Sequence, residues 1–132
     1  MTKILRTSLY TYIKTCPFCY YVYRGVFMSV DISVNGEVTT AYLNGEIDHH
    51  SAAAIRNAID NAAELNMPSL LILDFTRVSF MDSSGIGLVM GRYRNLSRRG
   101  AKLHITGTSP QIYKVMKLSG IEKLATIDVC EK

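Results

Sequence analysis

Residues Val78–Gly87, with the sequence VSFMDSSGIG, decide how this chain folds. They follow a continuous apolar run, Leu70–Leu73, and precede a stretch with the periodicity of a helix. The segment therefore predicts the point where a buried strand passes into a helix. Because the first N–H groups of a helix lack partners within it and carry partial positive charge, this point suits an anion or a phosphate.

The adjacent residues Ser83 and Ser84 allow three interpretations: a helix cap, a nucleophile, or the acceptor of a phosphoryl group. A nucleophilic serine needs a nearby base, and the segment lacks the G-x-S-x-G pattern of hydrolases. We therefore expect no catalytic residue. A phosphate on Ser83 or Ser84 would add a charge of about −2 beside Asp82 and would disturb a partner docked there. The spacing of the residues alone does not distinguish a capping serine from one that accepts a phosphate.

The surrounding pattern predicts a single α/β domain. Alternation over Ser29–Val34, the pair Asn35-Gly36 and the β-branched run Val38–Leu43 predict a hairpin with a type I′ turn, and Asn44-Gly45 is expected to end it. Helices are then expected between Asp48 and Asn66, Ser84 and Gly100, and Ser109 and Gly120, and strands at Leu70–Phe75, Lys102–Thr106 and Ala125–Val129. The order β-β-α-β-α-β-α-β predicts one mixed β-sheet covered by helices.

Apolar residues at helical spacing are expected to face the sheet. They are Ala52, Ile55, Ile59 and Ala62 in the first helix, Ile86, Val89, Tyr93 and Leu96 in the second, and Ile112, Val115, Met116 and Leu118 in the third. The arginines of the second helix are expected on its solvated face, with a protein interface as the alternative; they are Arg92, Arg94, Arg98 and Arg99.

The basic excess of the chain lies entirely in its first 27 residues. These contain Lys3, Arg6, Lys14 and Arg24 and no acidic residue, so they account for the whole formal charge of +4. Residues 28–132 are balanced in charge and show no basic stripe of the kind that nucleic acid requires. No apolar run approaches the roughly 18 residues of a membrane span. We therefore expect neither a nucleic-acid nor a membrane partner.

Residues 1–27 are predicted to be an extension outside the domain, which would span residues 28–132. One explanation is upstream sequence translated from a wrongly chosen start, with Met28 as the natural first residue. A targeting peptide would need an apolar core with a cleavage site. A metal site at Cys16 and Cys19 would need a second pair of ligands, and a redox site there would need a βαβ unit after it. With these two cysteines set aside, Cys130 alone builds no disulfide framework, and we expect a cytoplasmic protein.

Asp48-His49-His50 invites a metal interpretation. Neighbouring residues on a helix project about 100° apart, and no acidic residue completes a ligand set at helical spacing. We expect no metal and no cofactor, with Asp48 as a cap or surface contact. Gly85 and Gly87 fit no phosphate-loop motif and are expected to allow close backbone packing.

Several segments together resemble the STAS-domain anti-sigma factor antagonists. They are Gly45–His50 (GEIDHH), Phe80–Gly87 (FMDSSGIG), Gly91–Tyr93, Ser109-Pro110 and Leu118–Ile121 (LSGI). The resemblance runs from about Met28 to about Val129, and the first two segments in combination are typical of the sporulation branch. It implies a single STAS-like domain. Family members usually continue past the last strand into a further helix, so a chain ending at Lys132 is expected to lack it.

The resemblance implies regulation rather than catalysis. Family members bind an anti-sigma factor that is also a serine kinase, and so release the sigma factor. The kinase phosphorylates the serine directly after the motif aspartate, here Ser83, and a metal-dependent serine phosphatase restores the free hydroxyl. The expected partner-binding residues are Asp48, Asp82, Ser83, Ser84 and Gly85. The alternative is a STAS-type ligand-binding or scaffold module, which would bind a nucleotide or other anion without a kinase partner.

Overall fold

The computed structural model describes residues 2–5, 19–23 and 26–129. Within them, the strands are β1 (Thr2–Leu5), β2 (Cys19–Tyr23), β3 (Val26–Asn35), β4 (Val38–Ile47), β5 (Leu70–Met81), β6 (Lys102–Thr108) and β7 (Thr126–Val129). The helices are α2 (Ala52–Asn66), α3 (Ser83–Ser97), α4 (Pro110–Ser119) and the 3-10 helix η1 (Ile121–Lys123).

All the described strands belong to one mixed sheet with the order β1-β3-β4-β5-β6-β7, and β2 also pairs with β3. The β3–β4 hairpin is antiparallel, whereas β4, β5, β6 and β7 run parallel. Parallel neighbours need crossover connections, which α2, α3 and α4 supply. From β3 onward, the predicted order β-β-α-β-α-β-α-β is confirmed.

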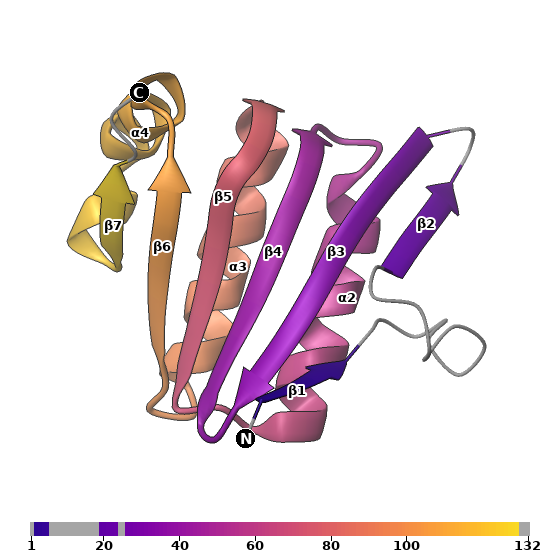
Figure 1. Ribbon diagram of the computed structural model, residues 1–132. Coiled ribbons are helices and arrows are strands. Elements are labelled where there is room, and N and C mark those ends of the chain that lie inside the picture. The colour runs from indigo at the N-terminus through magenta and orange to yellow at the C-terminus, as the bar shows by residue number, and fades with distance from the viewer. Residues whose placement is uncertain (1, 6–18, 24–25, 130–132) are drawn as a thin grey trace.

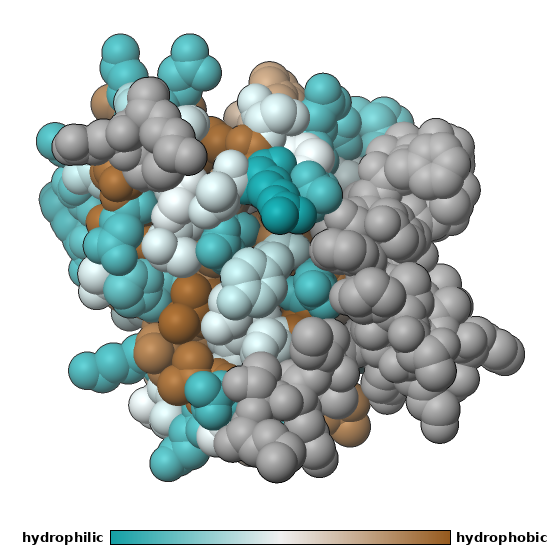
Figure 2. All heavy atoms as spheres, viewed as in Figure 1, coloured by the Kyte–Doolittle hydropathy of each residue, from teal (hydrophilic) through white to brown (hydrophobic). Residues whose placement is uncertain are grey.

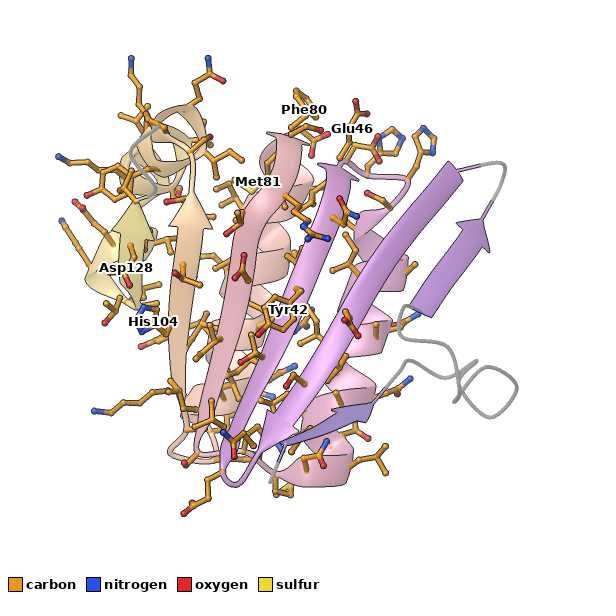
Figure 3. The ribbon with its side chains drawn as sticks, viewed as in Figure 1. Tyr42, Glu46, Phe80, Met81, His104 and Asp128 are labelled. Atoms are coloured by element: carbon orange, nitrogen blue, oxygen red, sulfur yellow. The ribbon has the colours of Figure 1, made fainter. Side chains whose placement is uncertain are left out.

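The core lies between the sheet and the helices α2 and α3, which stand behind the sheet in Figure 1. Alternate strand residues point into it, as the period of two in a strand requires. Fully buried examples are Val30, Ile32, Ala41, Leu73 and Ile105 on the strands and Ala58, Ile59 and Val89 on the helices. The other face of the sheet carries mixed polar and apolar side chains (Figure 2). Tyr42 lies on this face and is 44% exposed (Figure 3).

The hairpin turn lies one residue later than predicted. Asn35 pairs with Val38 as the last residue of β3, so Gly36 and Glu37 form the turn. Gly36 has a φ of +63°, and Met67 is the only described residue other than glycine with a positive φ. A type I′ turn needs positive φ at both central residues, whereas a type II′ turn needs it only at the first. The type I′ prediction was therefore wrong, and the glycine sets a turn of the II′ pattern.

Asn44-Gly45 does not end β4. The strand continues to Ile47 beside β5, with shifts of register between Tyr42 and Asn44 and between Gly45 and Glu46. Gly45 has a φ of +101°, a conformation that glycine adopts without strain. The prediction of a break was wrong because this glycine accommodates an irregularity within a paired strand.

The prediction was wrong for three helix residues: two that were expected in the core are exposed, and one that was expected on the surface is buried. Leu118 is 81% exposed and Val115 is 40% exposed, whereas Ile112 and Met116 alone fill the buried face of α4. Arg92 is only 6% exposed, and its Nε lies 2.9 Å from Oδ1 of Asp60 on α2. Burial lowers the pKa of Arg92, against the opposing effect of Asp60. Helical spacing alone did not identify this ion pair between two helices.

The N-terminal segment contributes backbone to the sheet, because β1 and β2 both pair antiparallel with β3. Cys16 and Cys130 lie outside the described residues, as do the last residues to Lys132. The boundary between residues 27 and 28 stays a prediction. No helix in the described ranges is long and apolar enough to cross a membrane.

Candidate functional site

The junction between β5 and α3 carries most of the predicted site residues. Asp82 is the N-cap residue of α3, with extended backbone angles of φ −104° and ψ −166°. Its Oδ1 accepts a hydrogen bond of 2.8 Å from the Ser84 N–H, and its carbonyl accepts one of 3.0 Å from the Gly85 N–H. The aspartate thus satisfies one of the unpaired donors of the first helical turn.

This arrangement answers the question of the helix cap. Neither serine is the N-cap residue, because Asp82 occupies that position. Ser83 is the first helical residue and is exposed, whereas Ser84 is half-buried. The Ser83 hydroxyl makes no hydrogen bond to any residue that the structure describes. The capping interpretation of these serines was therefore wrong.

The loop after β4 lies beside this junction. Ile47 and Met81 are paired across the parallel strands, and the Asp82 N–H donates to the Ile47 carbonyl over 3.1 Å. Asp48 follows directly after Ile47. The structure therefore brings Asp48, Asp82 and Ser83 to one edge of the sheet, although the first two are 34 positions apart in the sequence.

Asp48 organises the turn that precedes α2, three residues before Ser51, which is the N-cap residue of that helix. Its Oδ1 accepts hydrogen bonds from the N–H groups of His50, at 2.9 Å, and Ser51, at 3.0 Å. The Ser51 hydroxyl donates to the Glu46 carbonyl over 2.8 Å, which closes the turn against β4. Hydrogen bonding from the Ser51 N–H lowers the pKa of Asp48 below its ordinary value. The carboxylate therefore remains ionised at neutral pH.

The two glycines after the serines have different surroundings. A Cβ on Gly85 would overlap the Cγ of Met81 and would approach Ile47, so this position requires the close approach that we expected. A Cβ on Gly87 would meet nothing within 4 Å. The packing prediction is thus confirmed for Gly85 and wrong for Gly87, which faces open space.

A groove between α2 and α3 adjoins Ser84. It has a volume of about 390 Å³ and is lined by His49, Ala52, Ala53, Arg56, Ser84, Gly87 and Leu88. Arg56 is the charged residue that sequence reasoning missed. It lies one helical turn after Ala52, a spacing that could have placed it beside the loop of Asp48.

His49 and His50 do not lie on a helix as assumed, but in the turn before α2. Their ring centroids are 3.9 Å apart with the planes tilted by 40°. Among the described residues, no group of three or more histidine, cysteine, aspartate or glutamate side chains is placed to hold a metal ion.

Comparisons with known proteins identify the family of this chain. The model of the STAS domain family matches residues 29–130. An anti-sigma F factor antagonist from Lysinibacillus sphaericus is 38% identical over 88 residues, which cover 67% of this chain and 75% of that protein.

Two solved structures of SpoIIAA are similar to this chain at 33% sequence identity. The anti-sigma factor antagonist SpoIIAA in its unphosphorylated form gives a TM-score of 0.66 and covers 80% of this chain and 89% of that chain. The Bacillus cell fate determinant SpoIIAA in the phosphorylated form gives a TM-score of 0.62 and covers 80% and 92%. The chain belongs to the STAS domain family, within its group of anti-sigma factor antagonists.

Proposed function

We propose that this antagonist is a switch controlled by phosphorylation of Ser83. Its unphosphorylated form binds an anti-sigma factor that is also a serine kinase, and this binding releases the sigma factor. Transfer of a phosphoryl group to Ser83 ends the interaction. A metal-dependent serine phosphatase removes the phosphate and returns the protein to its binding state.

The observation that carries this proposal is the position of the Ser83 hydroxyl. It is exposed on the first residue of α3, and Asp82 performs the capping that a serine at this junction would otherwise provide. A kinase can therefore reach the hydroxyl without breaking a hydrogen bond of the fold. Ser84 is less suitable, because it is half-buried and its N–H is held by Asp82.

The electrostatics of the junction favour release after phosphorylation. The N-terminus of α3 tolerates an anion, so the phosphorylated protein can keep its fold. A partner docked over this edge already faces the carboxylates of Asp48 and Asp82. A phosphate would add a charge of about −2 and a tightly held water shell to the same surface. The partner would lose affinity while the antagonist remained intact.

Relatives support this assignment. SpoIIAA, at 33% identity, is known in an unphosphorylated and a phosphorylated form. Anti-sigma factor antagonists act on anti-sigma factors by definition, which supports a partner of that class for this chain.

The proposal is tested by measuring the affinity of four proteins for the cognate anti-sigma factor: the wild type, Ser83→Asp, Ser83→Ala and Ser84→Ala. Ser83→Asp should bind at least about tenfold more weakly, because it adds a like charge beside two acids. Ser83→Ala should bind normally but accept no phosphate. Ser84→Ala removes the neighbouring hydroxyl and should still be phosphorylated, so it is the control for the identity of the acceptor. Full phosphorylation of Ser83→Ala would show that another residue is the acceptor.

Arg56 favours one alternative function. This cation lines the groove next to Ser84 and the N-terminus of α3, so the groove offers positive charge to an anion. In that case the protein would be a STAS-type module that binds a nucleotide or similar anion without a kinase. Tight equilibrium binding of a nucleotide to the wild type, lost in Arg56→Ala, together with no response to the kinase, would favour this alternative.

A further inference from the structure

Phe80 is a large apolar side chain left exposed near the end of β5, the strand that leads to the candidate acceptor serine. It lies on β5, three residues before Ser83, and is 49% exposed. The next residue, Met81, is 8% exposed because it points to the opposite face of the strand. The fold thus buries one neighbour and presents the aromatic ring at the end of the sheet.

Three acidic residues lie at the same end of the sheet as this ring. Phe80 is the strand partner of Glu46 on β4, and Figure 3 shows both side chains at the same end of the sheet. Asp48 and Asp82 follow the ends of these two strands at the same edge. Arg56 lines the groove between α2 and α3, which Ser84 also lines. The exposed edge therefore combines one apolar ring with three carboxylates.

We propose, on the basis of the proposed function, that Phe80 is the apolar anchor of the contact with the anti-sigma factor. The surface that fits it is an apolar pocket with basic residues at its rim, because the rim of this site is acidic. Aromatic residues are enriched in interfaces, and a few buried side chains carry most of the binding energy. Charges at the rim chiefly accelerate association.

This anchor explains how one phosphate can release the whole partner. Binding energy from an apolar anchor depends on excluding water from the ring. A doubly charged group three residues away keeps its water shell and prevents a dry contact from closing around Phe80. Phosphorylation then removes the apolar contribution as well as adding repulsion.

Leu65 provides a matched control. It is 62% exposed, more than Phe80, and lies at the C-terminal end of α2. Because α2 begins after the end of β4 and finishes before the start of β5, Leu65 is at the opposite edge of the sheet. Truncation of either side chain removes exposed apolar surface, but only one truncation changes the proposed contact.

The experiment measures binding of the full chain to the anti-sigma factor for the wild type, Phe80→Ala, Phe80→Leu and Leu65→Ala. Phe80→Ala should weaken binding at least about tenfold, mainly through faster dissociation. Phe80→Leu should recover part of the loss, and Leu65→Ala should stay within about twofold of the wild type. Thermal unfolding should show that all four proteins are folded at the temperature of the assay.

A second variant tests the rim. Glu46→Gln should slow association and reduce its dependence on salt, while leaving dissociation nearly unchanged. The anchor proposal is overturned if Phe80→Ala binds within about twofold of the wild type, or if Leu65→Ala loses as much affinity. If either result occurs while Ser83 is still phosphorylated and Ser83→Asp still loses the partner, only the anchor proposal fails. If the wild type neither binds the anti-sigma factor nor accepts phosphate, the proposed function fails with it.

Discussion

Two junctions between a strand and a helix lie at the same edge of the sheet, and they use serine differently. Between β6 and α4, Ser109 is the N-cap residue, and its hydroxyl accepts a hydrogen bond of 3.2 Å from the Ile112 N–H. Between β5 and α3, Asp82 is the N-cap residue, and Ser83 stands one position further along with an exposed hydroxyl.

The difference shows how a fold makes a hydroxyl available for modification. Between β6 and α4, the serine is itself the cap of the helix, and a phosphate on it would remove that cap. Between β5 and α3, the aspartate provides the cap and also complements the positive end of the helix. The serine is then dispensable for folding, which is what a reversible modification site requires.

The two helices also differ in how they are anchored. α3 is joined to α2 by the buried pair of Arg92 and Asp60, whereas α4 buries Ile112 and Met116 and leaves Val115 and Leu118 exposed. The candidate switch therefore stands on the more firmly held helix. Loss of the ion pair should affect this junction more than that of α4.

The largest effect on stability is expected from Asp60→Ala. This change leaves the Arg92 guanidinium, whose side chain is 7% exposed, without its carboxylate. Removing one partner of a buried pair is costly, and the partial exposure of Asp60 reduces the expected loss to about 2 kcal/mol. Urea unfolding measures it. The double change Asp60→Ala with Arg92→Met should recover part of the loss, and a loss below about 0.5 kcal/mol would show that the pair does not hold α3.

The next largest effect on stability is expected at the two helix junctions, where Ser109 and Ser83 can be compared directly. Ser109→Ala should lower the free energy of unfolding by about 1 kcal/mol, because it removes a helix cap. Ser83→Ala should lower it by less than about 0.5 kcal/mol, as for an exposed side chain without partners. Asp82→Ala should resemble Ser109→Ala. Equal losses for the two serine variants in urea unfolding would mean that Ser83 has a structural role and would remove the contrast between the junctions.

The smallest effect concerns the pH dependence of stability at the loop of Asp48. The pKa of this carboxyl is lowered from 3.8, chiefly by the hydrogen bond from the Ser51 N–H. A lowered pKa means that the stabilisation is present above the ordinary pKa and is lost as the pH falls through the lower value of the folded state. The wild type should therefore melt at a slightly higher temperature than Asp48→Asn at pH 5. The gap should narrow as the pH falls below the ordinary pKa of 3.8, and a gap that widened there would contradict the sign.

Local signals predicted much of the fold. Each of these signals depends on the conformational preference of its own short segment. They are the apolar run before Val78, the pair Ser109-Pro110 and Gly120. The order of strands and helices could therefore be predicted from the sequence. The junction of β5 and α3 was located for the same reason.

Features that depend on distant residues were not predictable in this way. Aspartate and serine are similarly good cap residues, so only the backbone angles of Asp82 distinguish it from Ser83. The burial of Arg92 depends on Asp60 from the preceding helix, and the continuation of β4 through Gly45 depends on pairing with β5. The groove that Arg56 lines exists because α2 and α3 lie side by side.

The most direct test of the central claim is phosphorylation of the wild-type protein by the cognate anti-sigma factor with ATP, followed by location of the phosphate by peptide mass spectrometry. Trypsin separates the two junctions, because Ser83 lies in the peptide Val78–Arg92 and Ser109 in Leu103–Lys114. We predict one phosphate on Ser83 and none on Ser109. A phosphate on Ser84 or Ser109 instead, or none while the kinase modifies another substrate, would contradict the account.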